Sequence, residues 1–254
     1  AYLRGLSAKR RLDVIITVGG PATVFAIRNR QDLLADVPLV VELEQRRLKE
    51  FGNTTNTVIV PFLANLPGVL DDILHVLPAT TNIVVILGAS PLEQYWVAET
   101  KRLFASHTNR LTFTYLNDLT LETMCSRVAA LPPHSAVLYV LLMIDSAGVP
   151  HQQLTGLTAL HAAANAPIFS LFEHELGMAI AGGRLTSMDT VGRRVVEASL
   201  RVLKGEPADG IKSEVIGPLH LHFCLAARSR AASLPLELLL QHLRRQTRDQ
   251  RQPV

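Results

Sequence analysis

The chain has 254 residues, of which 48% are hydrophobic and 19% are charged. This length suits one large α/β domain or two lobes of ordinary size, and the composition excludes an intrinsically disordered chain. The net charge is only +3. Residues 227–254 hold six arginines against Glu237 and Asp249, so the positive charge is concentrated in this tail. The rest of the chain has no basic stripe, and nucleic acid is therefore not expected as a partner.

Cysteine use and hydropathy narrow the class of protein further. Cys125 and Cys224 each lie in an apolar pattern, which predicts buried free thiols. The longest unbroken apolar run, 136–144, is too short to span a bilayer. No signal peptide is expected within the chain, because charged residues follow Ala1 closely, although a mature secreted domain would begin in the same way.

Short β-branched runs alternate with helical patterns along the chain. Strands are expected at 12–18, 37–43, 57–61, 83–87, 111–116, 136–144, 167–172, 212–216 and 220–225. Helices are expected at 22–35, 64–77, 91–106, 118–131, 151–164, 189–204 and 234–250. This alternation predicts an α/β fold with largely parallel sheets and helices on both faces.

Several predicted strands end in small and polar residues. An open parallel sheet binds its ligand at the carboxyl ends of its strands, so these loops are expected to line a site for a small polar molecule. The candidate ligand-binding residues are Gly20, Pro21, Glu42, Ser90, Pro91, Asp145, Ser146, Glu173 and His174. Loops of this composition also occur as plain connections and as helix caps, and that interpretation stays open.

The run 167–172 ends in three ionisable residues, Glu173, His174 and Glu175, and two glycines follow at 182 and 183. Because they follow a strand, Glu173 and Asp145 are expected to receive a ligand ammonium or hydroxyl group, with His174 as a secondary contact. Gly20, Pro21 and Ser90 are expected to offer backbone and hydroxyl contacts.

The motifs of catalysis and of metal binding are weak. The turn 19–21 lacks the G-x-G-x-x-G spacing of a dinucleotide site, and its proline removes one amide donor. The sequence contains no G-x-S-x-G and no HExxH. His220 and His222 share one side of a predicted strand, but no third ligand lies near them in the sequence. The chain is therefore expected to have no catalytic residues, no metal and no cofactor.

Several segments together resemble one known family. They are Asp13–Ala22 (DVIITVGGPA), 37–41 (VPLVV), 136–148 (AVLYVLLMIDSAG), 162–169 (AAANAPIF), 180–183 (IAGG) and 198–207, which ends in LKGEP. In this order the chain resembles the substrate-binding components of ABC transporters. It is most similar to the subgroup that forms extracytoplasmic sensor domains of bacterial histidine kinases. The resemblance runs from about residue 2 to about residue 232.

The resemblance implies a type I periplasmic-binding-protein fold, with two Rossmann-like lobes that have parallel sheets and are joined by three crossings. Lobe I would hold 1–61 and 179–212, and lobe II 62–178 and 220–254. The crossings would fall near 61–63, 176–180 and 213–219. Members usually begin with one or two further βα units before the strand at 12–18, so the resemblance also implies a first lobe shortened at its N-terminus.

The function that the resemblance implies is extracytoplasmic binding of a small molecule in the cleft between the lobes, without enzymatic activity. The chain would be the sensor domain of a two-component histidine kinase or the substrate-binding component of an ABC transporter. Its partners would be the ligand and a kinase module or a permease; a homodimer and a membrane anchor in the full-length protein are left open. An amino-acid-like or small carboxylate ligand is expected.

Two alternatives belong to other classes. A Rossmann-like nucleotide-dependent enzyme would need a phosphate cradle, which the sequence lacks. The effector core of a sugar-responsive repressor would share the fold but would carry a helix-turn-helix, which the sequence lacks as well.

Overall fold

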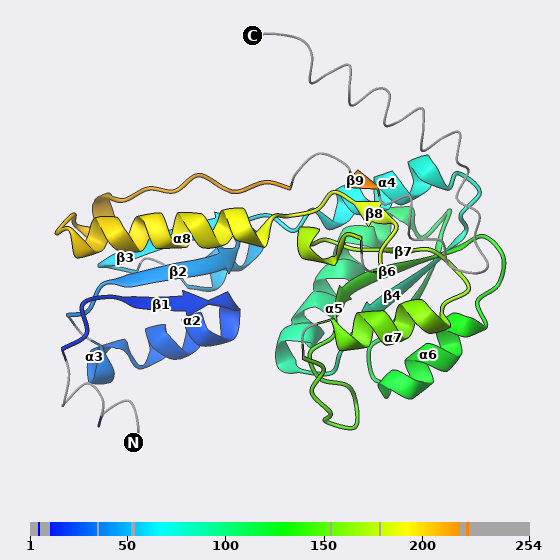
Figure 1. Ribbon diagram of the computed structural model, residues 1–254, viewed down its shortest axis with the longest axis horizontal. Coiled ribbons are helices and arrows are strands. Elements are labelled where there is room, and N and C mark those ends of the chain that lie inside the picture. Colours follow the sequence, from blue (N-terminus) through cyan, green and yellow to red (C-terminus); the bar gives the residue numbers. More distant parts are fainter. Residues whose placement is uncertain are drawn as a thin grey trace, which may run out of the picture. The chain divides into compact units, whose positions relative to one another are not determined.

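The chain folds into two α/β units, each built around a parallel sheet (Figure 1). The computed structural model describes residues 5, 11–34, 36–51, 54–152, 154–177 and 179–218, and the backbone of 222–223. The first unit comprises the described residues up to Ala64 together with Thr186–Pro218, and the second comprises Asn65–Leu185 with the strand at 222–223. The prediction of an α/β fold with largely parallel sheets is confirmed.

The first unit has a sheet in the order β1-β2-β3, with parallel neighbours. Its strands are β1 (Ile15–Val18), β2 (Leu39–Glu44) and β3 (Thr57–Phe62), and its helices are α2 (Gly19–Arg28), α3 (Arg30–Leu33) and α8 (Met188–Leu203), with short 3-10 turns at Gln45–Glu50 and Ala208–Gly210. All six residues of β2 are buried, because helices cover both faces of this central strand. Leu39, Val41 and Leu43 pack in the cluster that contains α2, whereas Val40 packs in the cluster that contains α8.

β1 forms an edge of this sheet. In the described part of the chain it pairs with β2 alone, and the side chains of Ile16 and Val18 are 45% and 67% exposed. Helix α8 contacts β2 and β3, and it leaves Val196, Leu200 and Leu203 exposed, at spacings that place them on one flank of the helix. The first unit therefore exposes apolar side chains on both its edge strand and its long helix.

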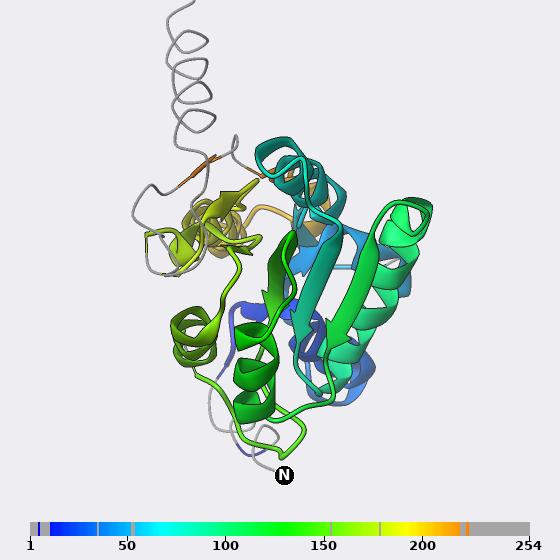
Figure 2. The same cartoon turned by 90° about the vertical axis from the view of Figure 1, so that its right-hand side faces the viewer.

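The second unit has a sheet in the order β5-β4-β6-β7-β8-β9, in which only β8 and β9 are antiparallel. Its strands are β4 (Asn82–Leu87), β5 (Thr112–Leu116), β6 (Ser135–Leu141), β7 (Ile168–Phe169), β8 (Gly182–Gly183) and β9 (His222–Phe223). Its helices are α4 (Leu66–Val76), α5 (Pro91–Phe104), α6 (Leu121–Ala129) and α7 (Thr155–Ala163), with 3-10 turns at Ala105–His107 and Glu173–Glu175. Helices lie on both faces of this sheet (Figure 2).

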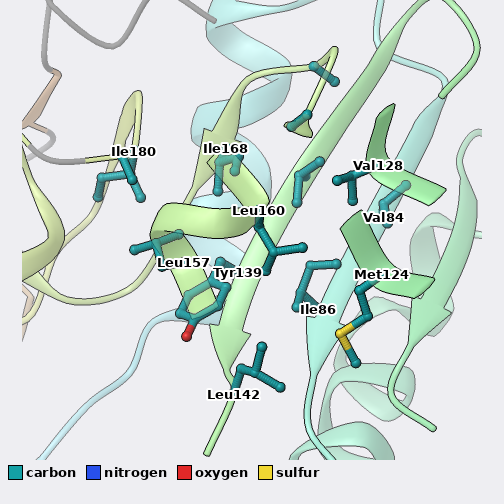
Figure 3. Close-up of a cluster of buried hydrophobic side chains, with 14 of the residues drawn as sticks. Val84, Ile86, Met124, Val128, Tyr139, Leu142, Leu157, Leu160, Ile168 and Ile180 are labelled. Carbon is teal, nitrogen blue, oxygen red and sulfur yellow. The ribbon is translucent and has the colours of Figure 1, made fainter. Parts of the chain in front are cut away.

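The core of the second unit follows from the alternation of side chains along β4 and β6. Val84 and Ile86 point to the face covered by α6 and α7, where Met124, Leu157 and Leu160 meet them (Figure 3). The intervening β4 residues are buried against the other face, where α5 contacts β4. A strand buried on both faces needs an unbroken apolar sequence, which is what the run Ile83–Leu87 supplies.

The division between the units differs from the expected one around residue 180. The chain passes between the units at 64–65, 185–186 and 218–219. Residues 179–185 belong to the second unit rather than to lobe I, because the Ala181 amide donates to the Ile168 carbonyl (2.7 Å) and Gly182 pairs with Phe169. Residues 213–218 belong to the first unit because Ile216 pairs with Phe62.

Some predicted elements differ from the observed ones. The expected strand at 212–216 is only a single bridge, from Ile216 to Phe62, because an isolated segment beside β3 makes too few ladder bonds to form a strand. The strand expected at 136–144 ends at Leu141, where the chain turns into the 145–151 loop. The helix expected at 234–250 lies outside the described residues. None of the described helices combines the length and the apolar character that crossing a membrane requires.

Leu160 tests the core of the second unit. It lies on α7, and its side chain is fully buried against α6 and the sheet. Leu160→Ala should therefore lower the free energy of unfolding by about 2–5 kcal/mol. Urea denaturation followed by circular dichroism measures the change. Val149→Ala is the control, because its side chain is 49% exposed and the expected change is within about 0.5 kcal/mol. Equal effects of the two substitutions would contradict this description of the core.

Candidate functional site

The carboxyl ends of β4, β6 and β7 lie side by side in the second unit, since these strands are consecutive in the sheet. The loops that follow them carry six of the nine predicted residues: Ser90, Pro91, Asp145, Ser146, Glu173 and His174. The register of β4 against β6 shifts between Ile86 and Leu87, which leaves Val140 as an extra residue near this end. Such bulges are common beside functional sites, where they change the direction of the strand.

Ser90 and Pro91 begin α5. The Ser90 hydroxyl accepts a hydrogen bond from the Glu93 amide (3.4 Å), and the Glu93 carboxylate accepts one from the Ser90 amide (2.9 Å), which is a capping box. The second oxygen of Glu93 accepts from the Met143 amide at 2.6 Å, so Glu93 ties the end of β4 to the end of β6. The sequence analysis did not single out Glu93; its position three residues after Ser90, with Pro91 at the first helical position, is the signal that would have identified it.

Asp145 organises its own loop. Its Oδ1 accepts hydrogen bonds from the amides of Ala147 and Val149, both at 3.0 Å. Its Oδ2 accepts from the Leu121 amide and lies 3.2 Å from His151 Nε2. Burial alone would raise the pKa of this carboxyl, but the hydrogen bonds from Leu121, Val149, His151 and Ala147 together lower it. A carboxylate has about four acceptor positions, so Asp145 is occupied by its own protein and leaves none for a ligand.

Glu173, His174 and Glu175 form a 3-10 turn after β7, and the turn gives them different environments. Glu173 is partly exposed, and His174 is exposed, with its ring stacked on Phe172 at a centroid distance of 5.9 Å. Glu175 is buried, and its Oε2 accepts a hydrogen bond from the fully buried hydroxyl of Ser170. Burial raises the pKa of Glu175 to about 7. The turn therefore points Glu175 into the protein, although the sequence analysis did not include Glu175 among the candidate ligand-binding residues.

The first unit carries the other three predicted residues, at the carboxyl ends of β1 and β2. Gly20 and Pro21 lie in the first turn of α2, which begins directly after β1. The first amide of this helix, that of Gly19, donates to Oε2 of Glu42 at 2.7 Å. Glu42 is buried, and desolvation raises its pKa while the Gly19 amide opposes that shift. The carboxylate at the start of this helix is therefore supplied by the protein itself.

Gly20 lies close against the end of the Arg47 side chain. A Cβ atom at this position would lie 1.9 Å from the Arg47 guanidinium, which forms an ion pair with Glu50 (2.8 Å). The neighbouring Arg46 bonds to Glu44 (2.7 Å) and to the Ala64 carbonyl (2.9 Å), which ties the end of β2 to the end of β3. These contacts join the carboxyl ends of β2 and β3 through the Arg46 side chain.

The sequence analysis also considered the pair His220 and His222, without predicting a metal site, and the two cysteines. No cluster of three or more potential metal ligands occurs among the described side chains. His220 lies outside the described residues, and only the backbone of His222 is described. Cys125 is half-buried, and desolvation raises the pKa of its thiol, whereas Cys224 lies outside the described residues.

Comparison with known proteins gives likenesses in structure but none in sequence. No protein-family model matches the sequence, and no curated protein matches it. The ABC domain in complex with L-Trp from Streptococcus pneumoniae is 13% identical and aligns with 94% of this chain and 81% of its own, at a TM-score of 0.68. A carbohydrate transporter from Acidothermus cellulolyticus in complex with myo-inositol is 16% identical over 87% of this chain and 78% of its own (TM-score 0.56). A LacI family transcriptional regulator from Bifidobacterium animalis subsp. lactis is 15% identical over 91% and 83% (TM-score 0.56).

These neighbours share the parallel α/β architecture of this chain, which has a type I periplasmic-binding-protein-like fold. The fold expected from the resemblance is confirmed. The three neighbours are described as a domain with a bound amino acid, a transporter and a regulator, rather than as enzymes.

Gly88 tests the link between the ends of β4 and β6. A Cβ atom there would lie 2.1 Å from Glu93 Oε1 and 2.4 Å from the Ile144 carbonyl oxygen. Gly88→Ala should therefore lower the free energy of unfolding by about 3 kcal/mol, measured by urea denaturation. Gly192→Ala in α8 is the matched control, because its Cβ would meet nothing within 4 Å and alanine should stabilise the helix by about 0.5–1 kcal/mol. A neutral Gly88→Ala would contradict the contact.

Glu175 predicts a specific pH dependence of stability. Its pKa in the folded protein, about 7, lies above the ordinary value of 4.5, so the folded state binds more protons between pH 4.5 and 7. The contribution of Glu175 to the free energy of unfolding is therefore greatest below pH 4.5. It decreases by about 3 kcal/mol as the pH rises through 7. Glu175→Gln should remove this part of the fall in denaturation midpoints between pH 4.5 and 8. Glu173→Gln should retain it, and parallel curves for all three proteins would contradict the buried carboxyl.

Proposed function

We propose that this protein is an extracytoplasmic small-molecule-binding protein that catalyses no reaction of its own. The observation that carries the proposal is the grouping of polar side chains at the carboxyl ends of three consecutive strands, β4, β6 and β7, in a type I periplasmic-binding-protein-like fold. This edge is where open α/β sheets bind ligands. The bound L-Trp and myo-inositol in two structural neighbours support a small polar ligand.

The groups that remain available at this edge define the proposed site. Ser146 and His174 are exposed and Glu173 is partly exposed, whereas Asp145 is filled by its own loop. The Ser90 hydroxyl accepts one bond but keeps its own hydrogen for a ligand acceptor. Gly20 and Pro21 belong to the first unit, at the start of α2, and stay a separate prediction. An amino acid or another small polar molecule matches this mixture of acceptor and hydroxyl groups.

Two biological roles agree with such a site: the sensor domain of a two-component histidine kinase and the substrate-binding component of an ABC transporter. In both roles the bound form of the protein is read by a partner, which is a kinase module in the first case and a membrane permease in the second. The gene context distinguishes them. A sensor has a kinase module on the same polypeptide, whereas a transporter component has permease and ATPase genes beside its own.

A thermal-shift screen tests the proposal. The purified chain is heated with amino acids, small carboxylates, sugars and nucleotides, each at several concentrations. A ligand at a hundred times its Kd should add about 2.7 kcal/mol, which raises the Tm by a few degrees for a protein of this size.

The enantiomer of each compound that gives a shift serves as the control for non-specific effects. Stabilisation by nucleotides alone would favour a nucleotide-dependent enzyme instead. A folded sample that no compound stabilises would contradict small-molecule binding.

A further inference from the structure

The open edge of β1 presents apolar side chains on one face of the first sheet. Ile16 lies opposite Val40 in the parallel register, and Val40 packs in the cluster that contains α8. Ile16 and, two residues later, Val18 therefore lie on the face of the sheet that α8 covers. Helix α8 lies over β2 and β3, however, and the side chains of Ile16 and Val18 remain exposed. The α8 face of β1 is thus left bare.

One flank of α8 faces toward this bare strand. The helix runs antiparallel to the strands, since it begins beside the end of β3, where Thr186 donates to the Leu63 carbonyl (2.9 Å). It ends beside the start of β3, where Asp209 accepts from the Thr57 amide (3.4 Å). Helices α2 and α8 lie on opposite faces of the sheet (Figure 1). With the right-handed β1-α2-β2 crossover that parallel strands adopt, the residues one position after the sheet-facing ones of α8 point toward β1.

The residues at those positions of α8 are apolar and exposed. Positions 195, 199 and 202 are buried, and the residue after each of them is Val196, Leu200 or Leu203. Together with Ile16 and Val18 these three residues form what we call the β1–α8 surface. Single exposed apolar side chains are ordinary, but five of them on two adjoining elements indicate a surface that another part covers.

The edge strand of the second unit differs from β1 in this respect. Within the described residues β5 forms an edge of its sheet, and its exposed side chains are those of Thr112 and Thr114. The other face of β5 is covered by α5, where Phe104 stacks on Phe113 at a centroid distance of 5.2 Å. A free edge with apolar side chains invites pairing with another strand, and β5 avoids such side chains. The composition of β1 is that of a covered strand.

Backbone groups of β1 are directed to the same open edge. The Ile15 amide donates to the Pro38 carbonyl (2.9 Å), so residue 15 directs its backbone groups toward β2. Successive residues of a strand direct these groups to opposite edges, which places those of Ile16 and Val18 at the open edge. Within the described residues β1 pairs with β2 alone. A further strand at this edge would complete their hydrogen bonds.

The second unit shows what occupies the equivalent position. Its strands β6, β7 and β8 follow one another across the sheet as β1, β2 and β3 do, and α7 connects β6 to β7 as α2 connects β1 to β2. The edge of β6 that corresponds to the open edge of β1 pairs with β4, in parallel. Helix α5 follows β4 and lies on the face opposite α7, in contact with α4. A strand and the helix that follows it therefore fill this position.

The spacing of the elements favours the same kind of occupant over a second copy of the chain. Neighbouring strands lie about 4.8 Å apart and packed helices about 10 Å apart, so one helix covers about two strands. Since α8 covers β2 and β3, the next helix position lies over β1 and one further strand. A second copy that paired its β1 antiparallel with this one would leave the two α8 helices roughly 20 Å apart, twice the distance of packed helices. The exposed flank of α8 would stay uncovered.

We propose that the β1–α8 surface binds a strand–helix segment of the same polypeptide, encoded ahead of residue 1. The strand pairs in parallel with β1 at the backbone groups of Ile16 and Val18, and the helix packs on their side chains and on the flank of α8. The segment is assigned to residues ahead of β1 because β4 and α5 also precede β6 in the chain. Its strand is a β-branched run and its helix has one apolar stripe, as covered elements require. This inference does not depend on the proposed function.

The gene provides the first test. The reading frame should continue ahead of the codon for Ala1 and should encode a β-branched run of about five residues, followed by about 10–14 residues with apolar positions at helical spacing. A stop codon in frame directly ahead of Ala1, or an upstream segment without this pattern, would overturn the inference.

Amide exchange followed by NMR tests the strand pairing. The chain extended by the upstream residues is compared with residues 1–254. The Ile16 and Val18 amides should exchange at least tenfold more slowly in the extended chain. The Ile15 amide is the control, because it already donates to Pro38, and its exchange should change less than threefold. Equal exchange of the Ile16 and Val18 amides in the two chains would exclude a strand at this edge.

Matched substitutions test the helix contact. In the extended chain, Leu200→Gln and Ile16→Thr should each lower the Tm by about 3 °C or more, because they place a polar group under the added helix. In residues 1–254 the same substitutions should change the Tm by less than about 1 °C, since both side chains are exposed. Val149→Gln, at an exposed position of the second unit, should have no such effect in either chain. If residues 1–254 are insoluble alone, equal Tm values for Leu200→Gln and Val149→Gln in the extended chain would still contradict the contact.

Light scattering over a range of protein concentrations tests the competing occupant. The extended chain should not associate through this surface, so Leu200→Gln and Ile16→Thr should leave its molar mass unchanged. A dimer of the extended chain that these two substitutions dissociate, and that Val149→Gln does not, would identify a second copy as the occupant and overturn the inference.

Discussion

Backbone amides at the carboxyl ends of the parallel strands need acceptors once the strands stop pairing, and buried carboxylates supply them in both units. Glu42 accepts from the first amide of α2, Glu93 accepts from two amides and joins β4 to β6, and Asp145 accepts from three amides around its loop. The loops keep their positions only while these acids accept the hydrogen bonds of the backbone amides. The charge of each acid then depends on how many donors it has, because donors stabilise the ionised form and burial opposes it.

This balance gives the buried acids at one sheet edge different pKa values. Asp145 has four donors, which lower its pKa despite burial, whereas Glu175 accepts from the Ser170 hydroxyl and the Phe172 backbone, and burial raises its pKa to about 7. Both follow strands of one sheet, so their position in the fold does not distinguish them. What distinguishes them is whether the following loop returns its own amides to the carboxylate. The 145–151 loop returns the amides of Ala147 and Val149 to Asp145, whereas the short turn after β7 gives Glu175 the backbone bond of Phe172 alone.

The sequence predicted the architecture well because buried parallel strands need unbroken β-branched runs, as at 83–87. It failed at 212–216, because an apolar pattern does not reveal whether a neighbour offers enough ladder bonds. At the candidate site, Glu173 and Glu175 look equivalent in sequence, since alternate residues of a strand share one face. The chain instead enters a 3-10 turn at Glu173, and only the structure shows which acid turns inward. Likewise, the sequence shows that Asp145 follows a strand but not that four donors surround it.

The open edge of β1 affects how the isolated chain behaves in solution. Within the described residues β1 has one neighbour, and its Ile16 and Val18 side chains remain exposed beside the apolar flank of α8. An unpaired strand edge with apolar side chains is a template on which another strand can add. In the part of the chain that the structure describes, this edge offers such a template, and a charged residue at position 18 is the substitution that would oppose strand addition there.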